Sequence, residues 1–218
     1  NEGCIPSKSL LHLSKIINNN KNASNHGLIF SKPKLDINKI QNWKNDIISN
    51  LNKGISKLAH VRNINIINGH ASFKSAEKLE ITDLQNKKIS ITFKNCIIAT
   101  GSKPQVLKHL NKQHPSIINS KDALNFKHIP KRLLIIGGGY IGLELGTVFS
   151  SFGSKVTIAE FLPNLLSMAD EDLVKPLEES LNNKFENIYL STEVTSVIPQ
   201  NNDAVVVAFK QQNKEFKD

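Results

Sequence analysis

The most regular pattern of apolar and polar positions lies between residues 133 and 160. Residues 133–136 are four consecutive apolar residues, which predict a short buried strand. Residues 156–159 predict a second strand, and Gly153 before them is placed to end a helix. Between the strands, apolar side chains recur at helical spacing and are expected to face a sheet: Ile141, Leu145, Val148, Phe149 and Phe152. The order of strand, helix and strand predicts a parallel α/β unit.

Another helix is predicted near the start of the chain, where Leu10, Leu13 and Ile17 form an apolar stripe. Pro6 suits the first helical position and leaves Cys4 just outside the helix. A cysteine beside a helix N-terminus has its thiolate stabilised by the helix dipole and by unpaired N–H groups. Cys4 is therefore either a reactive thiol or an inert small residue, and local sequence leaves both readings open.

A polar, asparagine-rich loop is expected over residues 18–37. Residues 38–60 then predict a long amphipathic helix with Trp43 on its apolar side, where a core position is expected. A further helix is expected between Met168 and Leu181. Short apolar runs predict strands at residues 64–67, 71–73, 79–82, 89–93, 96–101, 187–190, 194–197 and 204–209.

The turn after the first central strand carries Gly137, Gly139 and Gly142, which fit the spacing G-x-G-x-x-G. The first glycine allows a tight turn, the second lets a pyrophosphate approach the backbone, and the third lets the helix pack closely on the strand. The helix N-terminus then directs N–H groups at the phosphates. The predicted dinucleotide contacts are Gly137, Gly138, Gly139, Tyr140, Ile141, Gly142, Leu143 and Glu144.

Glu160 stands at the end of the second central strand. An acid at this place accepts hydrogen bonds from an adenosine ribose and repels a 2′-phosphate. The next residues, Phe161, Leu162, Pro163 and Asn164, include no cation that would hold such a phosphate. The sequence therefore predicts NAD rather than NADP, and the alternative is a turn that only resembles a dinucleotide site.

Composition and charge narrow the classes of function slightly. The chain has 218 residues and a net charge of +9, with the basic residues scattered, which favours a solvated basic surface over nucleic-acid binding. No apolar run approaches the roughly 20 residues of a membrane span, and no signal peptide is visible. Two cysteines, Cys4 and Cys96, exclude a disulfide-stapled scaffold and favour a reducing compartment. We expect a cytoplasmic protein, or a mitochondrial matrix protein if the source is eukaryotic, with no metal site.

Residues 1–8, NEGCIPSK, resemble the second half of the redox motif of flavin-dependent disulfide reductases, C-x-x-x-x-C-[IV]-P-[SK]-K. The Ile-Pro-Ser-Lys form is most similar to that of the dihydrolipoamide dehydrogenases. Residues 99–104 resemble the family signature A-T-G-[ST]-x-P, and residues 118–124 resemble its S-x-x-A-L turn and short helix. The first redox cysteine and the N-terminal glycine motif of the family do not occur here. The only methionine is Met168, so we expect material to be missing at both ends.

The resemblance implies roles for single residues. Cys4 would be the flavin-proximal cysteine, and Lys8 would lie near the flavin N5 region, paired with Glu144 from the NAD domain. A buried lysine beside a flavin needs such an anion to stay charged. The other implied contacts are Ala71, Thr100, Gly101 and Ser102 with FAD, and the backbone of Val194 with the adenine of NAD.

The resemblance also implies two incomplete domains, each a three-layer ββα sandwich of the α/β class. Residues 1–129 would form a partial FAD-binding domain, including most of a link over residues 105–132, and residues 130–218 a partial Rossmann-type NAD-binding domain. A complete family member is a homodimer that oxidises the dihydrolipoamide of lipoyl domains in 2-oxo acid dehydrogenase complexes. The alternatives are a catalytically inactive remnant that at most binds nucleotide, or a reductase of the mercuric or glutathione type.

Overall fold

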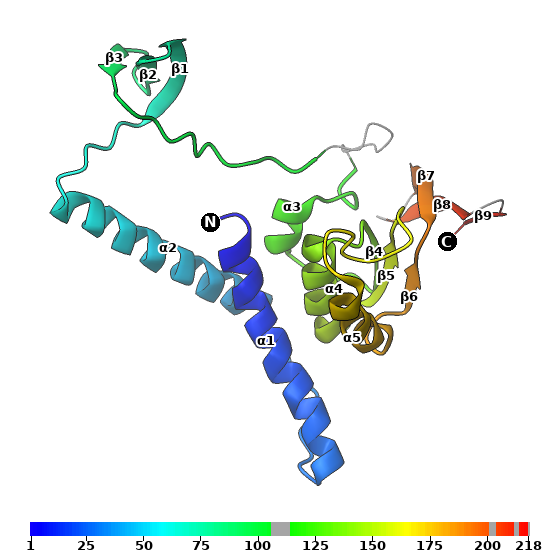
Figure 1. Cartoon of the computed structure of the whole chain (residues 1–218). Coiled ribbons are helices and arrows are strands. Elements are labelled where there is room, and N and C mark those ends of the chain that lie inside the picture. Colours follow the sequence, from blue (N-terminus) through cyan, green and yellow to red (C-terminus); the bar gives the residue numbers. More distant parts are fainter. Residues whose placement is uncertain (106–113, 201–203, 212–213, 218) are drawn as a thin grey trace. The chain divides into compact units, whose positions relative to one another are not determined.

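A computed structural model of the chain describes residues 1–105, 114–200, 204–211 and 214–217 (Figure 1). The chain divides into two compact units, one combining Asn1–Ile48 with Pro104–Asp218 and the other comprising Ser49–Lys103. Part of the predicted link, residues 106–113, lies outside the described residues. The domain boundary expected after residue 129 stays a prediction, because a division by packing density does not identify FAD- and NAD-binding domains. Among the helices of the described residues, none has the length and apolar character needed to cross a bilayer.

The larger unit is built on a parallel sheet with the strand order β4-β5-β6. The strands are β4 (Arg132–Ile136), β5 (Lys155–Ala159) and β6 (Asn187–Tyr189). They are connected by the helices α4 (Tyr140–Phe152) and α5 (Glu171–Asn182). Helix α4 ends at Gly153, whose φ of 110° is left-handed and favours glycine. The predicted order of strands and helices is confirmed in this part of the chain.

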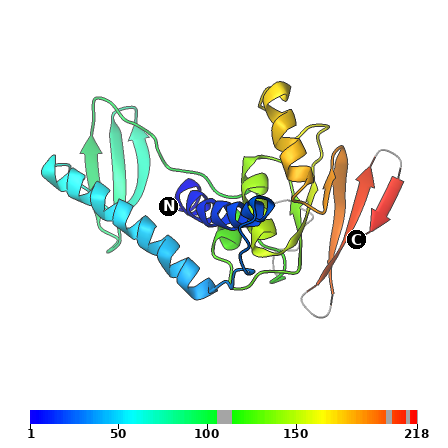
Figure 2. The same ribbon diagram turned by 90° about the horizontal axis from the view of Figure 1, so that it is seen from below.

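Alternate residues of the parallel strands face opposite layers, as the period of two in a strand requires. Val156 and Ile158 of β5 pack in the cluster that contains the buried side chains of α4, whereas Ala159 packs with the buried residues of an antiparallel sheet. That sheet has the order β7-β8-β9, with strands β7 (Thr192–Pro199), β8 (Val205–Gln211) and β9 (Lys214–Lys217). Figures 1 and 2 show it, orange to red, on the side of the parallel sheet away from α4. The predicted α/β fold class with ββα layers is confirmed here.

Helix α1 (Cys4–Ala23) packs against α4 in the same unit. The helix begins at Cys4, so the prediction that it begins at Pro6 is wrong. The first four N–H groups of a helix have no partner inside it, and a proline in the first turn therefore costs nothing. The loop predicted from residue 18 is also wrong at its start, because α1 continues to Ala23 and is followed by the 3-10 helix η1 (Ser24–His26).

Two side chains that were expected to be buried are exposed. Ile141 is 45% exposed, because it lies in the first turn of α4, before that helix runs along the sheet. Helix α2 (Ile37–Val61) confirms the predicted long helix and contributes residues to both units, but Trp43 on it is 37% exposed rather than part of the core. The short helix α3 (Ser120–Leu124) is confirmed, and its N-terminus is closed by a capping box between Asn119 and Asp122.

The smaller unit contains an antiparallel sheet in the order β1-β2-β3. Its strands are β1 (Gly69–Ser75), β2 (Lys78–Asp83) and β3 (Lys88–Thr92), which confirms three of the predicted strands. Residues 64–67 and 96–101 do not form the predicted strands, and Ile97 is 91% exposed. An apolar run becomes a strand only when a neighbouring strand completes its hydrogen bonds, and no described residue pairs with these two runs.

Candidate functional site

The glycine turn between β4 and α4 has the three properties that its spacing predicts. Gly137 has a φ of 108°, which a side chain would strain. A Cβ atom on Gly142 would clash with the carbonyl oxygen of Gly137 and lie 3.1 Å from the Ile135 side chain. A Cβ atom on Gly139 would meet nothing within 4 Å. The turn is therefore tight at its first glycine, open at its second and closely packed at its third.

Gly138 lies beneath the segment that follows β5. A Cβ atom on Gly138 would clash with the side chain of Leu165, which is fully buried. The N–H group of Leu166 donates to the Gly138 carbonyl oxygen over 3.1 Å. This cover over the turn was missed by the sequence analysis. Its signal was two adjacent leucines, Leu165 and Leu166, in the segment between the second central strand and the next helix.

Glu160 is hydrogen-bonded to the same turn. Its Oε2 atom accepts from the N–H group of Gly138 over 2.5 Å, and its Oε1 atom accepts from the N–H group of Leu162 over 2.7 Å. The Glu160 backbone donates to Tyr189 and accepts from Thr192, each over 2.8 Å. The backbone of Glu160 is therefore held by β6 and β7, and its carboxylate is held by the turn and by the N–H group of Leu162.

The thiol of Cys4 lies in the first turn of α1, where it is exposed. At this position, beside the helix N-terminus, the helix dipole stabilises a thiolate. Cys96, in the smaller unit, is also a free and exposed cysteine. The structure therefore places Cys4 where a reactive thiol is expected, and its role in catalysis stays a prediction.

The structure brings together two predicted site residues, Lys8 of α1 and Glu144 of α4. The Lys8 Nζ atom lies 2.5 Å from the Glu144 Oε1 atom. The hydrogen bond to Glu144 raises the pKa of Lys8, and the charges of Glu144 and of a Cys4 thiolate act in the same direction, against a smaller effect of burial. The Lys8 side chain is 61% exposed, so the lysine that was expected to be buried is mostly exposed among the described residues.

Ser7 contacts the same carboxylate and was missed by the sequence analysis. Its hydroxyl lies 2.9 Å from the Glu144 Oε2 atom and 3.3 Å from the carbonyl oxygen of Cys4. The side chain is 7% exposed. In the sequence, Ser7 stands out only as a small hydroxyl residue in the first turn of a helix, next to Lys8, and this local position does not reveal its partner on α4.

The contact between α1 and α4 continues along both helices. The hydroxyl groups of Ser14 and Ser151 lie 2.6 Å apart, and the Asn18 side chain donates to Ser151 over 3.0 Å. Ser14 is 1% exposed. Leu10, which is fully buried, packs in the same cluster as the α4 side chains. The helix that carries Cys4 is therefore joined to the helix that follows the glycine turn by apolar packing and by polar contacts.

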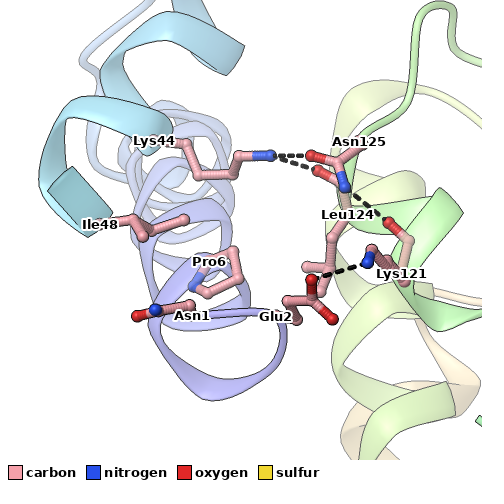
Figure 3. A pocket seen from close by; sticks show the side chains of 8 residues that line it. All are labelled: Asn1, Glu2, Pro6, Lys44, Ile48, Lys121, Leu124 and Asn125. Carbon is pink, nitrogen blue, oxygen red and sulfur yellow. Dashed lines mark hydrogen bonds and ion pairs between the residues drawn. The ribbon is translucent and has the colours of Figure 1, made fainter. Parts of the chain in front are cut away.

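A pocket of about 250 Å³ lies near the start of α1, and Lys44 is one of the residues that line it (Figure 3). The Lys44 ammonium group of α2 donates to the Leu124 carbonyl oxygen and to the side chain of Asn125, each over 2.8 Å, and to Gln41 over 2.7 Å. Lys44 is 1% exposed and has no carboxylate partner among the described residues. Its three acceptors use all three of its N–H bonds, so Lys44 connects α2 to the end of α3 rather than offering a donor to a ligand.

The other predicted NAD contacts differ in exposure. Tyr140 and Ile141 are 64% and 45% exposed beside the glycine turn. Leu143 and Val194 are 4% and 5% exposed and belong to the apolar clusters on the two faces of the sheet. Because so little of either residue is exposed, the predicted contacts of Leu143 and Val194 with a dinucleotide stay a prediction.

The other predicted flavin contacts lie in the smaller unit. Ala71 is an exposed residue of β1. Thr100, Gly101 and Ser102 are exposed and lie outside helices and strands, with a φ of 74° at Gly101. Cys4 and Lys8 belong to the larger unit. A site that combines these residues therefore stays a prediction.

A parallel sheet with a glycine turn and a terminal acid, beside a helix that carries a cysteine and a paired lysine, is the arrangement expected of a nucleotide-dependent redox protein. The comparison with protein families agrees with this class. The chain matches the family described as pyridine nucleotide-disulphide oxidoreductase over residues 1–217, and it belongs to that family.

The similar proteins include dihydrolipoyl dehydrogenases. That of Vibrio cholerae is 42% identical over 197 residues, which are 90% of this chain and 41% of that protein. That of Buchnera aphidicola subsp. Schizaphis graminum is 41% identical over 215 residues, which are 99% of this chain and 45% of that protein. The chain thus spans less than half the length of these relatives.

Solved structures show the same fold. LpdA from Mycobacterium tuberculosis has a TM-score of 0.85 at 17% identity, with 99% of this chain and 47% of that chain covered. The HOCl-induced flavoprotein disulfide reductase RclA from Escherichia coli has a TM-score of 0.75 at 28% identity, with 100% of this chain and 45% of that chain covered. The predicted family and the predicted fold class are both confirmed.

Proposed function

We propose that the chain is the central part of an FAD- and NAD-dependent dihydrolipoyl dehydrogenase. The relatives from Vibrio cholerae and Buchnera carry that name. The observation that supports it most directly is the combination of an open Gly139 with Glu160 fixed beside it. A dinucleotide needs backbone that its pyrophosphate can approach and an acid for its ribose, and this turn offers both.

The residues present fit an NAD molecule in chemical terms. The backbone N–H groups at the start of α4 would hold the pyrophosphate, and the open space at Gly139 would let it approach the backbone. A carboxylate has about four lone-pair sites, and the bonds from Gly138 and Leu162 use two of them. The others accept the ribose hydroxyl groups, and the negative charge repels a 2′-phosphate. We therefore propose NAD rather than NADP.

At the other part of the site, the acceptor for the substrate dithiol in the complete enzyme would be a disulfide between Cys4 and the family's first redox cysteine. The dithiol would reduce that disulfide, and Cys4 would be released as the thiolate that faces the flavin. When bound, FAD and NAD supply the electron and hydride transfer itself. Lys8 presents an ammonium group to the flavin side, and Glu144 keeps that group charged through the ion pair. The packing of α1 on α4 would fix the helix that carries Cys4 relative to the helix that follows the glycine turn.

We further propose the setting of the complete enzyme. Its substrate is the dihydrolipoamide of lipoyl domains in 2-oxo acid dehydrogenase complexes, and it acts as a homodimer in the cytoplasm, or in the mitochondrial matrix in a eukaryote. These proposals rest on the family to which the chain belongs.

The free state of both cysteines favours a second candidate, a nucleotide-binding piece without catalysis. A single thiol in one unit cannot cycle between dithiol and disulfide within the chain. Calorimetric titration of the folded chain with NADH and NADPH separates the readings, together with an assay of NAD⁺ reduction by dihydrolipoamide. Reduction of NAD⁺ by dihydrolipoamide in a yellow, flavin-bound sample supports the proposal of a dihydrolipoyl dehydrogenase. NADH binding by a colourless, inactive chain supports the second candidate, and no heat with either dinucleotide contradicts both.

A further inference from the structure

Ser7 is the one hydroxyl group of the first turn of α1 that contacts α4 among the described residues. Its Oγ atom lies 2.9 Å from the Glu144 Oε2 atom, while Lys8 Nζ lies 2.5 Å from the Oε1 atom of the same carboxylate. The two oxygens of Glu144 are thus engaged by adjacent residues of one helix. A serine hydroxyl has a single proton to donate, and the shorter contact to Glu144 is preferred to the 3.3 Å contact with the Cys4 carbonyl oxygen.

The burial of the two contacts differs. Ser7 is 7% exposed, whereas the Lys8 side chain is 61% exposed and therefore free to move away from its partner. Exposed ion pairs are weak, because holding two long side chains in one geometry costs entropy. A buried hydroxyl at a fixed position on the helix loses little further entropy when it forms a hydrogen bond to the carboxylate. Ser7 is thus better suited than Lys8 to fix the orientation of Glu144.

We propose that Ser7 is a positioning residue: its hydroxyl group holds the Glu144 carboxylate in the orientation that pairs with Lys8. The significance of this position for catalysis rests on the function proposed above, in which Lys8 presents its charge beside the flavin. The hydrogen-bond geometry itself requires no cofactor. Without the hydroxyl group, the carboxylate rotates and Lys8 spends less time paired.

The test measures how fast an amine-reactive reagent labels Lys8 at pH 9. Mass spectrometry follows the labelling, and the labelling of Lys15 on the same helix is the internal reference. In Ser7→Ala we expect labelling of Lys8 to rise about threefold or more, because half a pKa unit changes the reactive unprotonated fraction about threefold. Ser9→Ala is the matched control. Ser9 is equally buried, and its hydroxyl donates to Ile5 within α1 rather than to α4. Its substitution should leave Lys8 labelling unchanged.

Ser7→Thr and Ser7→Val form a second pair of nearly equal shape that differs in the hydroxyl group. We expect slow labelling of Lys8 in the threonine variant and fast labelling in the valine variant. Equal rates in this pair overturn the proposal, even if the alanine variant fails to fold. Equal acceleration by Ser7→Ala and Ser9→Ala also overturns it, because that would indicate a general loosening of α1.

The labelling result is independent of the dinucleotide. If the unmodified chain gives no calorimetric heat with NADH, the proposed function fails, and the labelling rates still decide whether Ser7 positions Glu144. If NADH binds and the labelling rates do not differ, the function stands and the role of Ser7 fails.

Discussion

The carboxylate of Glu160 accepts a hydrogen bond from the N–H group of Gly138 over 2.5 Å. The acid that is expected to recognise a ribose is therefore also a structural partner of the glycine turn. Leu165 covers that turn from outside, and the Glu160 backbone is bonded to β6 and β7. A binding group held from several sides loses little freedom when a ligand arrives, which favours affinity.

The first prediction concerns Glu160→Ala. We expect NADH affinity to fall about tenfold or more, because hydrogen bonds to a charged group contribute roughly 1.5–3 kcal/mol. NADPH affinity should fall less, since the repulsion of its 2′-phosphate is removed together with the hydrogen bonds. Calorimetric titration with both dinucleotides measures the ratio. Glu179→Ala, which changes an exposed carboxylate on α5, should leave that ratio unchanged. An unchanged ratio in Glu160→Ala would contradict the assignment of NAD.

The second prediction contrasts two glycines of the same turn. Gly142→Ala places a Cβ atom against the Gly137 carbonyl oxygen, and we expect it to destabilise the fold by roughly 1–3 kcal/mol, as other overpacked substitutions do. In Gly139→Ala the added methyl group contacts no other atom within 4 Å. The free energy of unfolding of this variant should therefore stay within about 0.5 kcal/mol of that of the unmodified chain. Its NADH affinity should nevertheless fall, because the methyl group occupies the approach to the backbone. Urea unfolding and NADH titration of both variants check this contrast.

If Gly139→Ala binds NADH as tightly as the unmodified chain, no ligand approaches the turn at that residue. If Gly142→Ala is as stable as the unmodified chain, the close packing of α4 on β4 is not required for the stability of the fold. Either outcome would remove one of the roles that the glycine spacing predicts.

The part of the fold that the sequence predicted best is the part in which local pattern and tertiary packing agree. Val156 and Ile158 are apolar, lie on one side of β5 and are fully buried. The three glycines of the turn are restricted by backbone geometry, which is a local property that their spacing records. The pairing of Lys8 with Glu144 came from family resemblance, and nothing in the local sequence of either residue indicated it.

The predictions that failed depended on partners that are distant in the sequence. Ile97 lies in an apolar run that has no neighbouring strand among the described residues, and it is 91% exposed. Asn18 was expected in a loop because residues 18–37 are polar and rich in asparagine. The residue lies within α1, and its side chain donates to Ser151 on α4. Ser7 was overlooked for the same reason, because its partner is 137 positions away.

The third prediction concerns the pH dependence of the Lys8–Glu144 pair. Because Glu144 raises the pKa of Lys8 in the folded chain, the stability that the pair contributes is fully present below the ordinary lysine value of 10.5. It is lost as the pH rises through the higher folded-state value. Lys8 is largely exposed, so the contribution should stay below about 1 kcal/mol and decrease with added salt. Urea unfolding of the unmodified chain and of Lys8→Met, at low and high salt, measures it.

The fourth prediction concerns Lys44, whose ammonium group donates to the Leu124 carbonyl oxygen at the end of α3. The C-terminus of a helix carries partial negative charge and unpaired carbonyl groups, which explains how a buried lysine is tolerated without a carboxylate. In Lys44→Met, the carbonyl oxygen and the Asn125 side chain lose this donor, and we expect a loss of roughly 1–3 kcal/mol. Lys39→Met, at an exposed position on the same helix, is the control and should change stability by less than about 0.5 kcal/mol.

The pH dependence of Lys44 has the opposite sign to that of Lys8. Burial lowers the pKa of Lys44, so the unfolded chain, at the ordinary value of 10.5, binds this proton more tightly than the folded chain does. The stability of the unmodified chain relative to Lys44→Met should therefore rise with pH between the lowered folded-state pKa and 10.5. A stability difference that stays constant over that range would show that the three acceptors fully offset the cost of burying the charged amine, and one that falls would show that they exceed it.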